Sequence, residues 1–413
     1  MKHQWKPLLL VAYVFIFTGA IICMNDMLLP SLKDSFNLSY VQASSVQQSF
    51  YLVYLFFPIP IAYYISRYGY KTGLFTALLI CSVGSTLFIP AYYGASYILA
   101  LIAIFIISIG VTLVNVAANP LAALLGDPAG SHIRVNFVQL FSRIGYSITP
   151  IAATKLIYGS DNSVTFHFPY LILGIGTLLL ALFIFFSSFP SFKPELVKGF
   201  SVIGILKESR RYPQLFWGAI IMFFYVGAEA CTAGFFINYL REVAGYESTQ
   251  SARYLTFYYI ASTLVSLIGI YLLRFVSPGR LVALFGIGMI VMYLLAALTT
   301  SVWNPYYLIG MGAFISIMFP SLFSLGIEGI GHFTEKGSAL INIAVVGGAV
   351  FPPLQGMLAD ARGVQLSYLV PCACFVLIVL YGFYCDHKSG RQKQTKLRSN
   401  EDEGQPVVYS SGV

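Results

Sequence analysis

Residues 8–30 read LLLVAYVFIFTGAIICMNDMLLP, an apolar run that contains a single charged residue, Asp26. Roughly 20 apolar residues are enough to cross the hydrocarbon core of a bilayer as a helix. A charge near the bilayer centre costs roughly 2.5–3.5 kcal/mol or more, and such a charge usually faces a cavity or a partner. The run therefore predicts a membrane-spanning helix in which Asp26 faces a transport pathway. The alternative is that the helix leaves the membrane early and Asp26 caps the next turn.

The composition extends this prediction to the whole chain. Of 413 residues, 58% are hydrophobic and only 10% are charged, whereas a soluble globular protein has about 25% charged residues. Similar apolar runs recur along the sequence, so we expect an all-α membrane protein. The twelve predicted spans are 7–30, 44–65, 72–93, 97–122, 136–158, 168–188, 212–240, 252–274, 280–300, 305–327, 338–358 and 364–385.

The positions of the basic residues predict the orientation, because Lys and Arg accumulate on the cytoplasmic side. With both termini in the cytoplasm, 18 of the 24 basic residues fall on inner segments, four on outer segments and two inside spans. The net charge of +8 then reflects membrane insertion and not nucleic-acid binding. The first span is too long for a cleaved signal peptide, so we expect it to be retained. A multi-pass protein of the bacterial inner membrane is the predicted localisation.

Nothing in the sequence indicates a bound cofactor or an enzyme. The six cysteines lie in or beside apolar spans without metal-binding spacing, so we interpret them as core residues. We find no Ser/His/Asp, HxxxH or nucleotide-binding arrangement. The chain is expected to work without a cofactor.

An internal repeat divides the chain into two similar parts. At an offset of about 200 residues, Asn119-Pro120 corresponds to Phe319-Pro320. Two like bundles with a midplane binding site between them are the arrangement of the major facilitator superfamily. The predicted domains are residues 1–189 (six-helix bundle), 190–211 (cytoplasmic linker), 212–385 (six-helix bundle) and 386–413 (disordered cytoplasmic tail).

Polar side chains inside the spans are candidates for substrate binding, because hydrocarbon offers them no partner. Amides both donate and accept hydrogen bonds, and tyrosines nearby can stack on a sugar ring, so the set suits a neutral polyol. Each amide alone could equally join two helices. The candidate residues are Gln47, Asn115, Asn119, Gln139, Ser142, Asn238 and Asn342.

Three ionisable residues lie deep in the predicted spans: Asp26, Arg143 and Glu229. Two acids and one base leave one carboxylate without a fixed counter-charge, with Arg143 as the charge partner of the other. An unpaired buried carboxylate can carry a proton, and the same charge could hold Na⁺. Asp26 and Glu229 are therefore the predicted coupling residues.

A series of motifs resembles the fucose–galactose–glucose:cation symporter family of the major facilitator superfamily. The resemblance runs through nearly all twelve spans. The motifs are Asn25-Asp26, Leu28-Leu29-Pro30, Gln42-Ala43, Phe50-Tyr51, Pro58-Ile59-Pro60, Ala117-Ala118-Asn119-Pro120, Tyr225-Val226-Gly227-Ala228, Phe323-Ser324-Leu325-Gly326-Ile327 and Gly347-Gly348.

The resemblance implies a role for several of these residues. Asp26 corresponds to the helix-1 acid that takes part in proton coupling in that family. Asn115 and Ser142 stand where the fucose branch has an acid and a sugar-binding asparagine, whereas Gln139 is kept. Glu229 and Asn238 are more similar to the glucose/galactose branch, which favours a hexose over fucose as the substrate.

Our leading hypothesis is a secondary active symporter that imports a monosaccharide by alternating access. The absence of a cluster of three oxygen ligands on one face around Asp26 favours H⁺ over Na⁺ as the coupling ion. The alternatives are a Na⁺-coupled symporter, a drug or metabolite exporter of the same fold, and a non-transporting receptor. We expect the protein to act as a monomer in the lipid bilayer.

Overall fold

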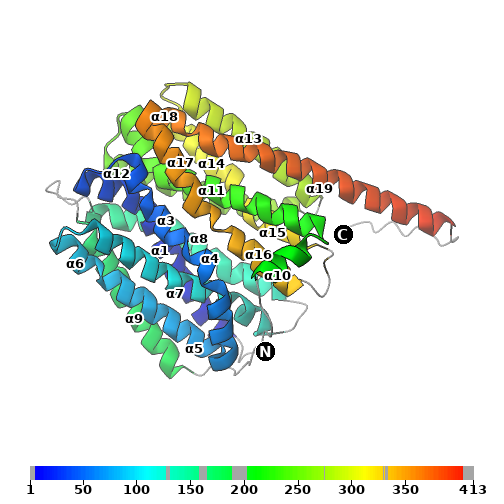
Figure 1. Ribbon diagram of the computed structural model, residues 1–413, viewed down its shortest axis with the longest axis horizontal. Coiled ribbons are helices and arrows are strands. Elements are labelled where there is room, and N and C mark those ends of the chain that lie inside the picture. Colours follow the sequence, from blue (N-terminus) through cyan, green and yellow to red (C-terminus); the bar gives the residue numbers. More distant parts are fainter. Residues whose placement is uncertain are drawn as a thin grey trace.

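The computed structural model describes residues 5–126, 131–157, 165–187, 202–273, 275–328, 330 and 334–402, and these residues are almost entirely helical. The chain folds into two groups of helices, an N-terminal half and a C-terminal half (Figure 1). The N-terminal half comprises α1 (Trp5–Phe36), α2 (Tyr40–Ala43), α3 (Ser45–Tyr51), α4 (Val53–Phe56), α5 (Pro58–Thr86), α6 (Phe88–Tyr93), α7 (Tyr97–Leu124), α8 (Ser131–Ile157) and α9 (His167–Phe186).

The C-terminal half follows a connecting segment that contains α10 (Val202–Ser209). Residues 188–201, which include most of the predicted linker, lie outside the described residues. The C-terminal half comprises α11 (Pro213–Val243), α12 (Ser248–Leu272), α13 (Pro278–Leu298), α14 (Asn304–Ile315), α15 (Met318–Ile327), α16 (Thr334–Ala344), α17 (Gly347–Arg362), α18 (Val364–Ser367) and α19 (Leu369–Asp402).

In all twelve predicted spans nearly all of the described residues are helical, although some spans are broken into short helices, which confirms the predicted fold class. Nine helical stretches in the described part of the chain are long and apolar enough to cross a membrane. Helices suit this environment because each satisfies its backbone hydrogen bonds internally. The helix α1 continues for ten residues beyond Asp26. Asp26 therefore lies inside a helix and does not cap a turn.

Helix packing joins the two halves along several pairs of helices. Within the halves, α1 packs on α8 and α5 on α7, and α13 packs on α19 and α11 on α17. Between the halves, α8 packs on α12, α1 on α11, and α17 on both α2 and α3. Helices α1, α3, α8, α11 and α12 therefore meet at the interface between the halves, and this interface contains the candidate site.

Proline and glycine account for several of the breaks within the spans. Proline lacks the backbone N–H and disrupts the preceding helical turn. Pro58 begins α5 after the short helices α2–α4, and Pro320 follows the break between α14 and α15. Gly69 has a φ of 84° at a kink within α5, a conformation that glycine adopts without steric cost.

The predicted tail differs from the structure. We expected disorder from Asp386 onward, but α19 continues as a helix to Asp402. Side-chain contacts hold the start of this segment: Ser277 and Arg280 donate to Asp386, and Lys388 donates to Gln214 at 2.7 Å. The polar sequence suggested disorder because it has no apolar face, yet a helix that has already formed can continue at little further cost. Residues 403–413 lie outside the described residues.

Candidate functional site

Asp26 lies at the interface between the two halves and is 4% exposed. Two donors bind its carboxylate. Gln47 of α3 donates from Nε2 to Oδ1 at 3.1 Å, and Tyr259 of α12 donates its hydroxyl to Oδ2 at 2.8 Å. The amide of Gln47 is itself oriented, because Asn25 donates from Nδ2 to Gln47 Oε1 at 2.6 Å. Each carboxylate oxygen therefore faces a donor, one from each half of the molecule.

Glu229, the second predicted coupling acid, lies on α11 and is half-buried. The charges of Glu229 and Asp26 act on one another, and Arg143 is close enough for its charge to act on Glu229. Among the described residues, neither acid forms an ion pair within 4 Å. The structure thus brings the three predicted ionisable residues into one region without pairing them directly.

Arg143 instead holds a broken helix of the opposite half. It donates from Nη1 to the hydroxyl of Ser262 at 3.2 Å and from Nη2 to the backbone oxygen of Ser316 at 3.0 Å. In a regular helix that oxygen would accept from the N–H of residue 320, but residue 320 is a proline. Arg143 therefore supplies the donor that Pro320 lacks.

The amides of the N-terminal half form a separate pair. Gln139 of α8 donates from Nε2 to Asn119 Oδ1 of α7 at 2.9 Å, and Asn119 donates to the backbone oxygen of Asn115 at 3.2 Å. All three side chains are half-buried. Gln139 and Asn119 therefore contact each other directly, and within the described part of the chain no hydrogen bond connects these amides to Asp26.

The other predicted substrate residues have varied surroundings. Ser142 is buried beside Gly19 of α1, which has no side chain to hold the two helices apart. Asn238 is buried, and its Nδ2 has no hydrogen-bond partner among the described residues, whereas Asn342 donates to the backbone oxygen of Ser338 in its own helix at 3.0 Å. Asn238 therefore offers a free donor group, while the amide of Asn342 already makes one hydrogen bond within its own helix.

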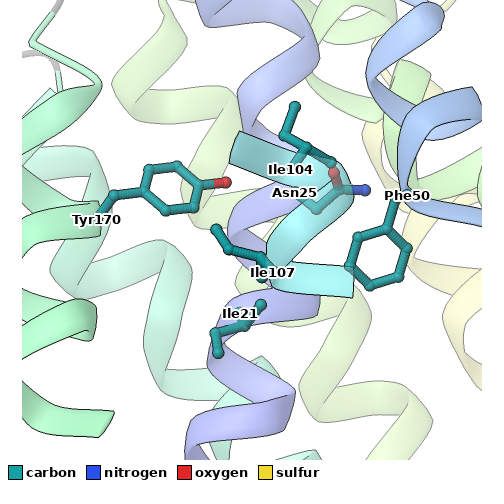
Figure 2. A pocket seen from close by; sticks show the side chains of 6 residues that line it. All are labelled: Ile21, Asn25, Phe50, Ile104, Ile107 and Tyr170. Carbon is teal, nitrogen blue, oxygen red and sulfur yellow. The ribbon is translucent and has the colours of Figure 1, made fainter. Parts of the chain in front are cut away.

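A small pocket lies on the other side of Asn25. Figure 2 shows Asn25 and Tyr170 reaching it, and its remaining walls are Ile21, Phe50, Ile104 and Ile107. The Oδ1 atom of Asn25 is buried and has no hydrogen-bond partner in the part of the chain that the structure describes. Walls this apolar do not suit a sugar, whose hydroxyls need donors and acceptors, so we do not place the substrate here.

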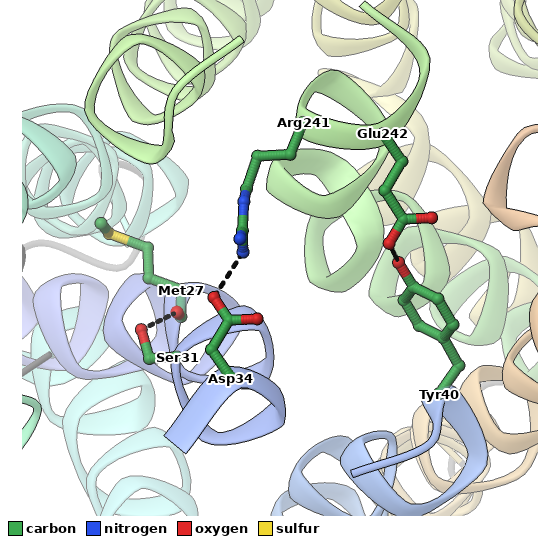
Figure 3. Close-up of polar contacts among 6 residues, drawn as sticks. All are labelled: Met27, Ser31, Asp34, Tyr40, Arg241 and Glu242. Atoms are coloured by element: carbon green, nitrogen blue, oxygen red, sulfur yellow. Dashed lines mark hydrogen bonds and ion pairs between the residues drawn. The ribbon is translucent and has the colours of Figure 1, made fainter. Parts of the chain in front are cut away.

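A second polar cluster joins the two halves where α1 ends and α2 begins. Arg241 of α11 forms an ion pair with Asp34 of α1 at 2.5 Å, and the hydroxyl of Tyr40 donates to Glu242 (Figure 3). Asp360 of α17 accepts from the backbone of α2. We call Asp34, Tyr40, Arg241, Glu242 and Asp360 the end cluster. It closes this end of the interface with contacts from four helices.

The contact with Asp360 completes the first turn of α2. The backbone N–H groups of Tyr40 and Val41 donate to its two carboxylate oxygens at 2.7 and 3.0 Å. The first N–H groups of a helix have no partner within the helix, so an acceptor there is stabilising. Burial and the neighbouring Glu242 raise the pKa of Tyr40, which keeps its hydroxyl as a donor.

Sequence reasoning found the charged residues of this region but missed two of their partners. Tyr259 is one of 29 tyrosines, and 233 residues separate it from Asp26, so no local pattern marks it. The backbone oxygen of Ser316 did have a signal, because Pro320 four residues later predicts an unpaired carbonyl.

Comparisons with known proteins agree with this architecture. Residues 9–345 match the sequence profile of the Major Facilitator Superfamily. The chain is 33% identical to a glucose/galactose transporter of Brucella abortus, over 92% of this chain and 94% of that protein. It is 28% identical to the L-fucose-proton symporter of Escherichia coli, over 91% of this chain and 92% of that protein.

Solved structures show the same fold. The Escherichia coli fucose:proton symporter in its outward conformation aligns with a TM-score of 0.70 at 28% identity, over 92% of this chain and 98% of that chain. The inward open xylose transporter of Escherichia coli aligns with a TM-score of 0.73 at 13% identity, over 92% and 96% of the two chains. The second likeness concerns the fold alone.

Proposed function

This chain belongs to the major facilitator superfamily, and from that premise we propose that it is a secondary active symporter that imports a monosaccharide by alternating access. It is a multi-pass membrane transporter and not an enzyme. The observation that carries the proposal is Asp26, a buried acid in α1 that both halves of the molecule contact. A group in this position can link ion binding to the relative movement of the halves.

We propose a hexose such as glucose or galactose as the substrate, with fucose as the alternative. The relative named for glucose and galactose is 33% identical, and the relative named for L-fucose is 28% identical. The half-buried amides Asn115, Asn119 and Gln139 support a polyhydroxylated ligand, because each has both donors and an acceptor. Ser142 and Asn238 are further proposed binding residues. We place Asn342 and Gln47 at the edge of the proposed sugar-binding site.

We propose H⁺ as the coupling ion. Na⁺ bound at Asp26 would need further oxygen ligands. The side chains that contact Asp26 present hydrogens instead: Gln47 turns its nitrogen toward the carboxylate, because its oxygen accepts from Asn25. Burial of Asp26 favours its protonated form and the two donors favour its ionised form, so the two effects oppose each other and the group can gain and lose a proton.

The distribution of basic residues supports an orientation with both termini in the cytoplasm. The end cluster then lies on the outer side of the membrane. We further propose that the protein works as a monomer in a bacterial inner membrane, without a cofactor.

Transport by the purified protein in sodium-free liposomes tests the proposal. Glucose, galactose or fucose added outside should be taken up and should drive proton influx, and Asp26→Asn should abolish that influx while sugar exchange persists. A strict requirement for Na⁺ without a pH change would overturn the choice of ion. Failure to transport any of these sugars would overturn the proposed substrate class.

A further inference from the structure

The hydrogen bond from Tyr259 to Asp26 crosses between the two halves. Tyr259 belongs to α12 in the C-terminal half, and its hydroxyl lies 2.8 Å from Asp26 Oδ2. Its side chain is buried, and its ring packs against Tyr146 of α8 at a centroid distance of 5.0 Å. The ring is therefore held in place, and the hydroxyl reaches the carboxylate from the opposite half.

The two donors to Asp26 differ in how they move relative to it. Gln47 belongs to the same half as Asp26, so this contact can persist when the halves rock against one another. Tyr259 belongs to the other half, so its distance to Asp26 depends on the conformation of the transporter. Hydrogen bonds to an ionised carboxylate favour the charged form over the protonated form.

We propose that Tyr259 is a positioning residue that makes the proton affinity of Asp26 depend on the conformation. This inference rests on the proposed proton symport. When the halves close at the end cluster, Tyr259 donates to Asp26 and stabilises the carboxylate. The O–H bond of the Asp26 carboxyl breaks and its proton passes to water on the cytoplasmic side. When the halves separate at the end cluster, the hydroxyl withdraws and Asp26 accepts a proton from the outside.

Other groups near Asp26 do not replace this contact. An ionised Glu229 would disfavour a second ionised carboxylate nearby, and the charge of Arg143 acts on Glu229. Five other titratable side chains would interact with Asp26 if they were charged. They are Cys23 of α1, Tyr51 of α3, Tyr146 of α8, Tyr170 of α9 and Tyr258 of α12. Within the described residues, Tyr259 is the hydrogen-bond donor that the C-terminal half supplies to Asp26.

Tyr259→Phe tests the proposal because it removes one hydroxyl and keeps the ring. In liposomes we expect sugar counterflow, which needs no net proton movement, to stay within about twofold of wild type. Concentrative uptake should fall several-fold, by up to about tenfold, at neutral internal pH, because proton release becomes harder and a shift of one unit lowers the ionised fraction of Asp26 by at most about tenfold. The internal pH that gives half-maximal uptake should rise by about one unit, the shift expected for one lost hydrogen bond to a charged group.

A second measurement follows the protonation of the Asp26 carboxyl group directly, by infrared spectroscopy. The infrared band of its protonated carboxyl group can be assigned by its loss in Asp26→Asn, and its pH midpoint in Tyr259→Phe should also rise by about one unit. The matched control is Tyr258→Phe on α12, because Tyr258 is also buried and is not among the described side chains that donate to Asp26. We expect wild-type midpoints and uptake in that variant.

The outcomes separate this proposal from the proposed function. Unchanged accumulation and pH midpoints in Tyr259→Phe would overturn the role of Tyr259, even if wild-type protein moves sugar with protons. Loss of counterflow together with accumulation would assign Tyr259 a structural role and would also overturn it. Sugar uptake by wild-type protein without proton movement would contradict the proposed function itself.

Discussion

Gln139 and Asn119 hold each other in place across α8 and α7 through the bond from Gln139 Nε2 to Asn119 Oδ1. Paired amides are fixed in orientation and still have unused donors and acceptors. A sugar hydroxyl that binds beside them would therefore meet groups whose orientation is already set. This reduces the entropy that must be lost on binding.

Gln139→Ala should weaken sugar affinity by about 1–3 kcal/mol, or roughly 5–150-fold, because a sugar hydroxyl loses its partner and Asn119 loses its orientation. Equilibrium binding of the sugar to purified protein checks this value. Gln365→Ala is the control, since that amide bonds to backbone oxygens at the end of α13. Wild-type affinity in a normally folded Gln139→Ala protein would remove Gln139 from the site.

Single residues differ in how far the sequence alone could identify them. Asp26 and Glu229 could be predicted because a charge in an apolar run has few explanations. Tyr259 could not, because tyrosines are common throughout the spans and its role depends on which helix lies opposite Asp26. Gln139 and Asn119 were both recognised as polar residues inside predicted spans, but the hydrogen bond between them depends on the relative position of α7 and α8, which the sequence does not give.

At the scale of helices, a residue of the opposite half, Arg143, donates a hydrogen bond at the break between α14 and α15. Pro320 leaves the backbone oxygen of Ser316 without its helical partner, and Arg143 fills that role at 3.0 Å. An unpaired carbonyl in a membrane protein is costly, so this contact ties the shape of one half to the position of the other. The break is thus stabilised only while α8 lies beside it.

Arg143→Gln should lower the free energy of unfolding by about 1–3 kcal/mol, because it leaves the Ser316 oxygen unsatisfied. In a Pro320→Ala background the cost should be smaller, since residue 320 can then donate to that oxygen itself. The four proteins are wild type, Arg143→Gln, Pro320→Ala and the double variant. Their thermal unfolding in detergent measures the coupling between Arg143 and Pro320 as a double-mutant cycle.

Pro120→Ala, in α7, provides the control background for this cycle. Arg143→Gln should cost the same there as in wild type, because Pro120 does not free the Ser316 oxygen. Additive effects of Arg143→Gln and Pro320→Ala would contradict the proposed exchange of donors.

The sequence predicted the helices better than their interruptions. Apolar runs of span length fixed nearly all the helical segments, because the bilayer allows few alternatives. The division of α16 from α17 was less apparent, although Gly348 lies there and a side chain at that position would meet the ring of Tyr51 at 2.4 Å. Such a close approach is a property of two packed helices and not of either sequence segment alone.

At the scale of the whole molecule, the two halves are joined at one end by the end cluster and in the middle by Asp26 and Arg143. Four helices contribute to the end cluster, and its members come from both halves. Separation at that end would break an ion pair and three hydrogen bonds. A transporter that alternates needs such contacts to be few and individually weak, so that neither state is trapped.

Asp360→Ala should shift the balance toward a state open at the end cluster by roughly tenfold, because two N–H groups lose a charged acceptor. Spin labels at Ser35→Cys and Glu247→Cys, exposed positions on opposite halves, would report this as a larger population of long distances. Asp386→Ala removes an acid that bonds within the C-terminal half, and should leave the distances unchanged. An unchanged distribution in Asp360→Ala would mean that Asp360 does not stabilise closure.

The twofold organisation was predictable from the sequence, but the closed end was not. The repeat of Asn119-Pro120 at Phe319-Pro320 indicated two like bundles. A single sequence must encode every state of a transport cycle, however, so composition and spacing cannot specify which end is closed. Asp34 and Asp360 show which end is closed through their contacts with the opposite half, and these contacts are known only from the three-dimensional arrangement of the helices.

The Asp360 carboxylate at the start of α2 also has a consequence for hydrogen exchange. The amide protons of Tyr40 and Val41 are protected by a carboxylate from the other half, so their exchange with solvent deuterium depends on the position of that half. The exchange rate of these two amides therefore reports the conformation of the unmodified protein. Deuterium uptake should be slow while the end cluster is closed and faster while it is open. Mass spectrometry of the peptide around α2 could therefore follow turnover in the native chain, with no label attached.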